Sequence, residues 1–288
     1  MSRIHDLRIK LLNRFARTRA GKLILGRIGQ SLNDKQWVFV IGCYNSGTTL
    51  LQRLMQAHPD IATMPAEGVA FTDVIVRPEK YGWTRMWWKC VDQIRHDSDY
   101  SEHGARRLRS QWSWLVDKPS APCVLEKSIV NVVHAPFYEK YFNKPKFIHL
   151  VRNGYAVSEG IRRKASPAKW NNTEYKQAYP ISLCARQWVE TLEAVYTLNN
   201  QGGQVLEVKY EDLTRDPDSV LAEIFKYLEL PMLVEDVGEK KWLVHGNVDA
   251  IKNLNNKSIE ALSSNDKQEI QEIGSTWLSY YKYSNNSE

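Results

Sequence analysis

The sequence predicts a single α/β domain in which helices flank a parallel, P-loop-like β-sheet. Short apolar runs rich in valine, isoleucine and phenylalanine recur along the chain, and stretches with helical periodicity separate them. A glycine-rich turn joins the first of these runs to the helix that follows it. Because strands separated by helices pair in parallel, this alternation indicates a sheet that is covered on both faces. A chain of 288 residues is long enough to bury one large core.

Each element of this fold has its own signal in the sequence. Residues 37–41 form an apolar run that ends at Gly42, which predicts a buried strand. Residues 48–58 place leucines and a methionine on one helical face, and this helix is expected to end before Pro59. The same reasoning predicts further strands at 122–126, 146–151 and 204–208, and helices at 155–164, 182–198 and 217–228.

The positive charge of the chain is concentrated in its first 30 residues. Hydrophobic residues make up 43% and charged residues 25%, which are ordinary values for a globular protein. The net charge is +6, but residues 1–30 carry eight lysines and arginines against a single acid, Asp6, and the remainder holds 31 basic and 32 acidic residues. A nearly neutral body offers no basic face to DNA or RNA. We therefore expect no nucleic-acid partner.

The basic segment is predicted to be an N-terminal extension of residues 1–33, followed by the α/β domain at residues 34–288. Apolar residues recur in it at steps of three and four, which is the pattern of an amphipathic helix. Three roles fit this pattern: packing on the main domain, docking on anionic lipid through residues 1–30, or organelle targeting. If the segment is a membrane anchor, its deletion should release the protein from anionic vesicles. The apolar residues are Ile4, Leu7, Leu11, Leu12 and Phe15.

Other features indicate a cytoplasmic protein, with the basic segment as its candidate for membrane association. No apolar run approaches the roughly 20 residues that span a bilayer. The first residues lack the short apolar core of a secretory signal. The four cysteines are far apart and form no C-x-x-C pair, which favours a reducing compartment with scattered thiols in or near the core.

The turn between the first predicted strand and helix has the composition of an anion-binding loop. Its sequence is Gly42-Cys-Tyr-Asn-Ser-Gly47-Thr48-Thr49, and two glycines five residues apart let backbone N–H groups point inward beside a helix N-terminus. The spacing is that of a nucleotide P-loop, but Thr48 stands where the phosphate-binding lysine belongs. The loop therefore favours a single phosphoryl-like group over a triphosphate. The alternative is an ordinary strand–helix turn.

Three segments of the chain resemble one enzyme family. Residues 46–61, from Ser46-Gly-Thr-Thr to His-Pro-Asp-Ile61, resemble the 5′-phosphosulfate loop of sulfotransferases that use 3′-phosphoadenosine 5′-phosphosulfate (PAPS), above all the broad group that includes the tyrosylprotein and carbohydrate enzymes. Residues 146–154 are similar to the strand and turn that bind the 3′-phosphate, and residues 208–217 to the late strand–turn–helix segment. The resemblance implies that a sulfuryl group moves from PAPS, as co-substrate, to a hydroxyl acceptor, with no metal.

The resemblance also implies which residues bind PAPS. The donor carries a 5′-phosphosulfate and a separate 3′-phosphate, so two anion sites are needed. Arg152, at the end of a predicted strand, can form two parallel hydrogen bonds with a phosphate. The basic run at residues 162–164 could add charge or form a solvated helix face. The complete predicted set is Asn45, Ser46, Gly47, Thr48, Thr49, Arg152, Ser158 and Tyr210, of which Tyr210 would line the nucleotide site.

Two positions depart from the family's pattern. Asn45 stands where a lysine or arginine usually precedes Ser-Gly-Thr-Thr, and Gly160 stands where relatives commonly have a serine. Ser158 is the nearest hydroxyl, but it lies about 200° around an α-helix from that position and would need a changed register. We therefore expect either that fewer charges hold the donor or that a cation comes from elsewhere in the chain.

Two residues are the catalytic candidates. Sulfuryl transfer needs in-line positioning, a cation at the leaving oxygen and a base for the acceptor proton. Lys127, at the end of a predicted strand, resembles the family's catalytic lysine, although it could also be a surface lysine paired with Glu126. Glu67 matches an acidic residue of similar enzymes after a one-residue shift, and it could instead be a solvated loop carboxylate. His103 and His134 are alternative bases because imidazoles titrate near neutral pH.

The acceptor is expected to be a carbohydrate, a glycolipid or a similar metabolite. Five of the ten tryptophans fall in residues 83–114 among lysines and arginines, and exposed aromatic faces suit sugar rings. Trp87 and Trp112 could instead pack an amphipathic helical insertion, which would account for at least part of this cluster. Two other functions compete with this one: a P-loop small-molecule kinase, and a catalytically silent protein of the same fold that binds glycans or membranes.

Overall fold

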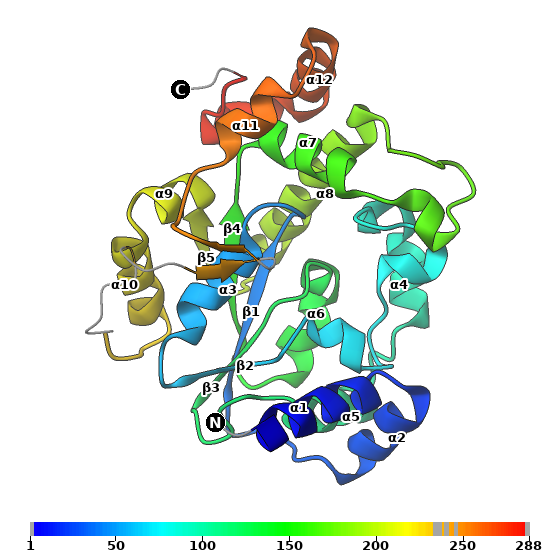
Figure 1. Ribbon diagram of the computed structural model, residues 1–288, viewed down its shortest axis with the longest axis vertical. Helices are drawn as coiled ribbons and strands as arrows, with labels where there is room; N and C mark the ends of the chain where they lie inside the picture. Colours follow the sequence, from blue (N-terminus) through cyan, green and yellow to red (C-terminus); the bar gives the residue numbers. More distant parts are fainter. Residues whose placement is uncertain (1–2, 233–237, 239–241, 245–246, 286–288) are drawn as a thin grey trace.

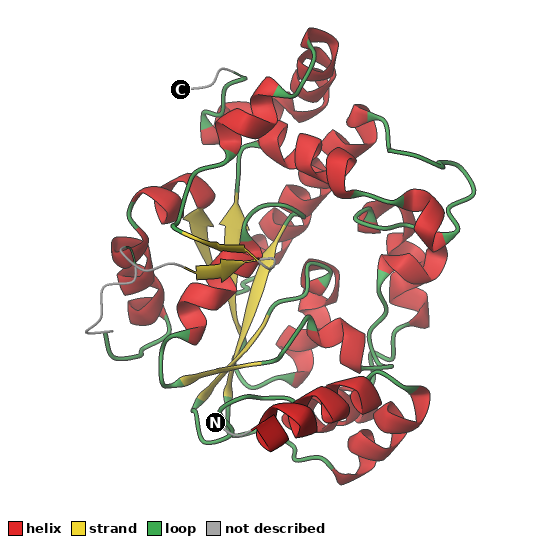
Figure 2. Cartoon of the chain, in the orientation of Figure 1, coloured by secondary structure: helices red, strands yellow, loops and turns green. Residues whose placement is uncertain are grey.

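The structure, a computed structural model, describes residues 3–232, 238, 242–244 and 247–285. Its centre is a five-stranded sheet with the order β2-β3-β1-β4-β5, in which all neighbouring strands are parallel. Helices lie on both sides of the sheet (Figure 1 and Figure 2). The predicted α/β architecture is therefore confirmed. The strands are β1 (Gln36–Gly42), β2 (Ile61–Thr63), β3 (Cys123–Glu126), β4 (Lys146–Val151) and β5 (Val205–Lys209).

Helices connect the strands, and the four helices that the sequence predicts within the α/β domain begin and end within two residues of their expected bounds. These four are α3 (Thr48–Gln56), α7 (Gly154–Lys164), α8 (Ile181–Asn200) and α10 (Pro217–Tyr227). The structure adds elements that the sequence analysis does not predict. They are strand β2, α4 (Val91–Asp97), α5 (Glu102–Ser113), α6 (Asn131–Tyr141), α9 (Tyr210–Arg215), α11 (Asn255–Glu260), α12 (Ser264–Tyr281), the antiparallel pair β6 (Trp242–Val244) and β7 (Asn247–Asp249), and short 3₁₀ turns η1 (Gly68–Phe71), η2 (Pro78–Tyr81), η3 (Trp87–Cys90) and η4 (Pro167–Trp170).

Strand β1 is buried on both faces because its side chains alternate between two apolar cores. Trp37 and Phe39 pack in the larger core, together with residues of α6 and α8. Val38 and Val40 pack in the smaller core, together with residues of α3 and α10. A strand covered on both faces needs an uninterrupted apolar run, and residues 37–41 provide one.

The carboxyl ends of β1, β3 and β4 bring three distant parts of the chain together. In the observed register, Phe39 of β1 pairs with Glu126 of β3, and Gly42 of β1 pairs with Leu150 of β4. The loop after β1, Lys127 after β3 and Arg152 after β4 therefore meet at one edge of the sheet. This is the edge at which ligands bind in open parallel sheets.

The basic N-terminal segment forms two helices, α1 (Arg3–Ala16) and α2 (Arg19–Ile28), beside the edge at which the strands begin (Figure 1). Helix α2 packs on α5, where Nε2 of Gln111 donates to the carbonyl of Lys22 at 2.9 Å. Gly29 approaches Ser110 so closely that a Cβ atom there would lie 2.0 Å from the Ser110 carbonyl oxygen. The amphipathic segment is thus helical, and α2 attaches it to the body.

The four cysteines are unpaired and buried, as the scattered spacing predicts: Cys43, Cys90, Cys123 and Cys184. Burial raises the pKa of Cys43, in the anion-binding loop, to about 12, so this thiol is protonated and unreactive near neutral pH. Over the ranges that the structure describes, none of the helices combines the length and the apolar character needed to cross a bilayer.

Candidate active site

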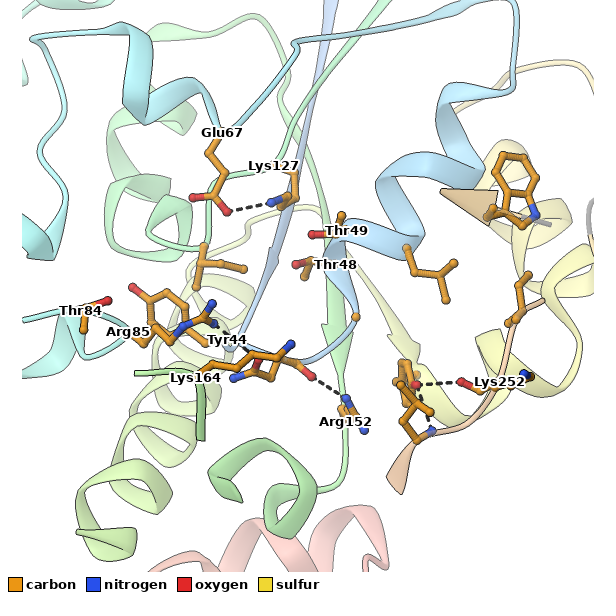
Figure 3. A pocket seen from close by; sticks show the side chains of 18 of the residues that line it. Tyr44, Thr48, Thr49, Glu67, Thr84, Arg85, Lys127, Arg152, Lys164 and Lys252 are labelled. Atoms are coloured by element: carbon orange, nitrogen blue, oxygen red, sulfur yellow. Dashed lines mark hydrogen bonds and ion pairs between the residues drawn. The ribbon is translucent and has the colours of Figure 1, made fainter. Parts of the chain in front are cut away.

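A pocket of about 590 Å³ opens at the carboxyl edge of the sheet. The loop after β1, the segment 79–85 and residues 250–254 form much of its wall (Figure 3). Its volume falls within the range of about 300–1,000 Å³ that is usual for ligand sites. Of the ten residues predicted for the site, eight line this pocket: Asn45, Gly47, Thr48, Thr49, Glu67, Lys127, Arg152 and Tyr210.

The loop after β1 has a left-handed backbone at two positions. Gly47, directly before α3, has a φ of 95°, and Asn45 has a φ of 63°. A Cβ atom at Gly47 would lie 2.6 Å from Cδ2 of Tyr210, so the backbone and the packing both require glycine there. Helix α3 then begins, and Figure 3 shows the hydroxyls of Thr48 and Thr49 at the pocket. The loop has the local form of an anion-binding turn.

Three buried polar atoms at this loop lack hydrogen-bond partners among the residues that the structure describes. They are Nδ2 of Asn45, Oγ of Ser46 and Nη2 of Arg152. A buried polar group without a partner costs about 1–3 kcal/mol, so such groups are uncommon away from ligand sites. All three groups carry hydrogens that an anion can accept. Ser46 itself is buried within the loop and does not line the pocket.

Arg152 follows β4 and is held by three contacts. Its Nε donates to Oδ1 of Asn255 at 2.8 Å, and its Nη1 donates to the Asn45 carbonyl at 2.7 Å. Its guanidinium carbon lies 4.2 Å from the ring centre of Tyr210. Burial lowers the pKa of Arg152, because the charged form loses water. These contacts fix the orientation of a guanidinium that still has hydrogens to donate.

Tyr210 connects the loop to the C-terminal part of the pocket. Its hydroxyl donates to the carbonyl of Lys252 at 3.1 Å and accepts from the backbone N–H of Leu254 at 3.2 Å. Its ring lies against Gly47 on one side of the loop. The backbone therefore satisfies the hydroxyl of Tyr210, while the residue lines the pocket as predicted.

Lys127 and Glu67 form an ion pair in the pocket. Nζ of Lys127 lies 2.7 Å from Oε1 of Glu67, and Figure 3 shows the pair beside Thr48 and Thr49. The lysine side chain is 8% exposed and the glutamate side chain is 41% exposed. The two catalytic candidates, which are 60 residues apart in sequence, thus lie in contact at the start of α3.

Glu126 is not the partner of Lys127, so that alternative is wrong. The carboxylate of Glu126 is buried and accepts hydrogen bonds from the backbone N–H of Gly68 at 2.7 Å, from the hydroxyl of Ser128 and from the side chain of Asn131. Burial raises the pKa of Glu126. The bond to Gly68 fixes the turn directly after the base candidate, so Glu126 helps to position it.

The two histidines considered as bases lie away from the pocket lining. His134 is fully buried, with Nδ1 at 2.6 Å from the hydroxyl of Tyr100 and Nε2 at 3.3 Å from the carbonyl of Val76. Burial lowers the pKa of His134 to about 3, so its imidazole is neutral at physiological pH. His103 is exposed on α5. Of the three candidate bases, only Glu67 lines the pocket.

Ser158 does not reach the pocket. Its hydroxyl is buried and donates to the carbonyl of Gly154, one turn earlier in α7, at 2.7 Å. Helical geometry places Ser158 away from the side of α7 that faces the loop, so its position does not support a role in donor binding. Gly160 faces the loop instead, and a Cβ atom there would lie 3.0 Å from Cβ of Asn45.

The pocket also contains side chains that the sequence analysis does not single out. Glu79, Thr84 and Arg85 come from the segment before η3, and Tyr44 comes from the loop. The segment has no periodicity and no motif that would identify these residues. Arg85 differs from the others in its backbone: its φ is 56°, which is uncommon for a residue other than glycine.

The basic run at the end of α7 divides into two roles. Arg162 pairs with Asp266 at 2.6 Å, and Arg163 pairs with Glu159 at 2.7 Å. Lys164 lines the pocket, where partial loss of water and the nearby charge of Arg85 lower its pKa. The run therefore contributes one cation to the site.

The tryptophans at residues 83–114 mainly fill the core. Trp83, Trp87 and Trp112 are buried, and Trp88 is half-buried. The interpretation of these residues as packing for a helical insertion is confirmed. Trp114 is exposed but does not line the pocket, so the cluster gives the active site no aromatic face for a sugar.

Comparison with known proteins shows the family of the chain. The family model described as "Sulfotransferase family" matches residues 37–236, which is more than half of the chain. Protein-tyrosine sulfotransferase 1 of the zebrafish Danio rerio is 23% identical over 222 residues, which cover 71% of this chain and 58% of that protein. The chain therefore spans little more than half the length of this curated relative.

Two solved structures share the fold. The sulfotransferase domain from the curacin biosynthetic pathway superimposes with a TM-score of 0.56 at 16% identity, covering 84% of this chain and 97% of that domain. Sulfotransferase STF9 from Mycobacterium avium gives a TM-score of 0.56 at 15% identity, covering 97% of this chain and 86% of that one. The family match contains all five strands of the main sheet, the anion-binding loop, Lys127 and Arg152. The chain therefore belongs to the sulfotransferase family.

Proposed function

We propose that this chain transfers a sulfuryl group from PAPS to a hydroxyl group of an acceptor molecule. One observation carries this proposal: the anion-binding loop and the Lys127–Glu67 pair line the same pocket. Asn45, which lines the pocket, has an unpartnered hydrogen-bond donor at this loop. The pair supplies a cation and a base candidate beside it, which simple nucleotide binding would not require.

In this proposal the donor lies across the carboxyl edge of the sheet. The backbone N–H groups at the start of α3 and the hydroxyls of Thr48 and Thr49 would bind the 5′-phosphosulfate. Arg152 would bind the 3′-phosphate, and Tyr210 would contact the nucleotide. The fit rests on charge and hydrogen bonding, since PAPS has two separate anionic groups and both the loop and Arg152 have hydrogens without partners.

Lys127 and Glu67 perform the two tasks that the transfer requires. A bond forms between the acceptor oxygen and sulfur while the bond between sulfur and the bridging oxygen breaks. Glu67 accepts the proton of the acceptor hydroxyl, and Lys127 donates a hydrogen bond to the oxygen that departs with the 5′-phosphate. In this mechanism, the 2.7 Å ion pair between Lys127 and Glu67 is the arrangement before the donor binds. A phosphate competes with Glu67 for the ammonium of Lys127, which frees the carboxylate to act as a base.

A carbohydrate or glycolipid hydroxyl is our first proposal for the acceptor. Its support is the group of Tyr44, Glu79 and Thr84, which line the pocket that contains Glu67 and offer several hydrogen-bonding atoms to a polyhydroxylated molecule. The zebrafish relative is named a protein-tyrosine sulfotransferase. The phenol hydroxyl of tyrosine is therefore the second acceptor to test.

Adenosine 3′,5′-bisphosphate, the nucleotide that remains after transfer, should stabilise the protein against heat. A ligand at one hundred times its dissociation constant adds about 2.7 kcal/mol to the free energy of unfolding, which raises the melting temperature by several degrees. We expect this shift with the bisphosphate and not with ATP and Mg²⁺. Differential scanning fluorimetry with each nucleotide measures it directly.

Other results of this experiment would lead to the competing functions. A shift with ATP and Mg²⁺ alone would replace the proposal with a small-molecule kinase. Stabilisation by neither nucleotide would favour a catalytically silent binding protein. After a positive result, transfer from labelled PAPS is tested on a sugar, a glycolipid and a tyrosine peptide, and label in the peptide alone would overturn the carbohydrate acceptor.

We further propose that α1 and α2 bind the protein to the surface of anionic membranes. The proposed location is the cytoplasm, because unpaired cysteines are typical of a reducing compartment. Six of the eleven large hydrophobic side chains that are exposed in the described chain lie within residues 9–28. Leu11 and Ile28 are the most exposed of these, at 58% and 59%. The predicted stripe of α1 therefore does not bury all of its members on the domain, although the side chains of Ile4 and Leu7 lie outside the described part.

Basic residues surround these exposed apolar side chains. Exposed cations that form no ion pair within the ranges that the structure describes include Arg8, Lys10, Arg14, Arg19 and Arg27. Apolar side chains flanked by cations complement a bilayer whose head groups are negative. Both helices lie beside the edge at which the strands begin, so binding there would leave the pocket at the opposite edge accessible (Figure 1).

The double variant Ile24→Ser/Ile28→Ser should bind vesicles that contain phosphatidylserine at least about tenfold more weakly than the wild type, because both side chains are exposed and apolar. Co-sedimentation measures this loss. The matched control is Tyr196→Ser/Tyr280→Ser, which removes two exposed side chains from α8 and α12. Unchanged binding, or equal binding to neutral phosphatidylcholine vesicles, would contradict the proposal. Substitution is preferable to deletion of residues 1–30, because Leu25 belongs to the core.

A further inference from the structure

We propose that Arg85 supplies a further positive charge at the 5′-phosphosulfate end of the donor site, beside the loop. This inference rests on the proposed function, since it names a further residue that binds the same donor. Loop residues 43–49 contain no lysine or arginine, and Lys127 is assigned to the single oxygen that leaves with the 5′-phosphate. Backbone N–H groups alone carry only partial positive charge. A cation from another part of the chain would complete the site.

Arg85 contacts the loop directly before its anion-binding turn. Its Nη1 lies 3.5 Å from Oδ1 of Asn45, and its guanidinium carbon lies 5.9 Å from the ring centre of Tyr44. Figure 3 shows the guanidinium beside Tyr44, with Lys164 next to it. All of these residues line the same pocket. A ligand held by the loop would therefore lie within reach of the guanidinium.

The guanidinium of Arg85 has no carboxylate partner in the described ranges. The side chain is half-buried, and it makes no salt bridge there. Two carboxylates line the pocket: Glu67 is paired with Lys127, and Glu79 is near enough for the charge of Arg85 to act on it but forms no salt bridge with Arg85. A half-buried guanidinium that is not neutralised retains hydrogens and charge for an anion.

The backbone at Arg85 is strained in a way that is common at ligand sites. Its φ of 56° lies in the left-handed region, which residues with a Cβ atom rarely adopt. Such a conformation persists only where the surrounding structure enforces it. Here Thr84 and Met86, the two neighbours in sequence, are both buried. The packing of these neighbours places the Arg85 side chain at the pocket.

Asn45 and Gly160, the two departures from the family's pattern, belong to one local arrangement. A Cβ atom at Gly160 would lie 3.0 Å from both Cβ and Cγ of Asn45, so a side chain there would displace the Asn45 amide. Because residue 160 is glycine, that amide packs on α7 with its oxygen facing Arg85. A neutral residue in the loop and an arginine from another segment thus occupy the region where the family's loop carries its own cation.

The test compares two arginines of the same segment. Arg85→Gln removes the charge and keeps much of the side-chain length. Arg77→Gln is the matched control, because Arg77 also packs over an aromatic ring, that of Trp170 at 5.4 Å, but is exposed and does not line the pocket. Isothermal titration calorimetry measures the affinity of each variant for adenosine 3′,5′-bisphosphate and for adenosine 3′-monophosphate.

We expect Arg85→Gln to weaken binding of the bisphosphate by about 10- to 100-fold and to leave binding of the 3′-monophosphate nearly unchanged. Arg77→Gln should change neither affinity. Arg85→Lys, which keeps a charge without the planar fork, should bind the bisphosphate with intermediate affinity, and it replaces the glutamine variant if that variant does not fold.

Three results would overturn the inference. Equal losses for both nucleotides would mean that Arg85 does not act at the 5′ end. Unchanged bisphosphate affinity, with or without a raised KM for the acceptor, would remove Arg85 from the donor site while leaving the proposed function intact. A wild-type protein that binds neither nucleotide would overturn the proposed function, and this inference with it.

Discussion

The Lys127→Ala variant should lose almost all sulfuryl transfer while it still binds the nucleotide. Lys127 is the cation at the oxygen on which charge develops, and loss of one such group lowers turnover about 10²- to 10³-fold. The free energy of unfolding should change little, because the partner, Glu67, is 41% exposed and water can solvate it. Turnover with labelled PAPS, measured beside bisphosphate affinity, separates the chemical step from binding.

Lys80→Ala is the matched control for this experiment. Lys80 forms an ion pair with Asp97 of the same 2.7 Å length, but neither residue lines the pocket. Its removal should therefore leave turnover unchanged. Turnover that survives Lys127→Ala would remove this lysine from the mechanism. A wild-type protein that never transfers sulfate, and whose glycan binding depends on Lys127, would support the catalytically silent alternative.

The parallel sheet is predictable from the sequence because its central strands are buried on both faces. Such strands appear as predominantly apolar runs: residues 37–41 of β1 are uninterrupted, and β4 carries Lys146 at its start and His149 within it. Helix α6 is not predictable in the same way, since nearly all of its sides are buried and it has no amphipathic pattern. It also contains Pro136, which lacks an N–H group and usually ends a helix. Strand β2 has only three residues, too few for a periodic signal.

The part of the site that lies at strand ends is also predictable. Lys127 and Arg152 each follow a buried strand, so the register of the sheet alone places them at the edge where the loop after β1 lies. Arg85 comes instead from an aperiodic segment whose position depends on how Met86 and Trp87 pack in the core. Nothing in the local sequence encodes that packing. The sequence therefore predicts either a donor held by fewer charges or a cation from elsewhere in the chain, and it does not indicate which segment would supply that cation.

The Arg152→Met variant should lose nucleotide binding while the free protein keeps nearly the stability of the wild type. Arg152 is 7% exposed, and its partners in the described chain are two oxygen atoms and the ring of Tyr210, with no carboxylate in contact. Glu211 and Glu159 act on Arg152 only from a distance, so burial of its charge still destabilises the fold, and this cost offsets the stabilisation from its contacts. Methionine removes that cost but leaves the oxygens of Asn45 and Asn255 without this donor. We expect the two effects to cancel to within about 2 kcal/mol in the free energy of unfolding.

Loss of the paired hydrogen bonds from the Arg152 guanidinium should weaken bisphosphate binding at least about 100-fold, so nucleotide affinity is the quantity that this variant changes most clearly. Arg109→Met is the matched control, because Arg109 is also 7% exposed, donates to the carbonyl of Tyr141 at 2.8 Å, and packs 4.9 Å from the ring centre of Phe142. Burial lowers the pKa of both arginines, but only Arg152 lines the pocket. Scanning fluorimetry with and without the bisphosphate should therefore show the nucleotide-dependent shift in Arg109→Met and not in Arg152→Met. Equal shifts in the two variants would mean that the cation for the 3′-phosphate is another residue of the pocket.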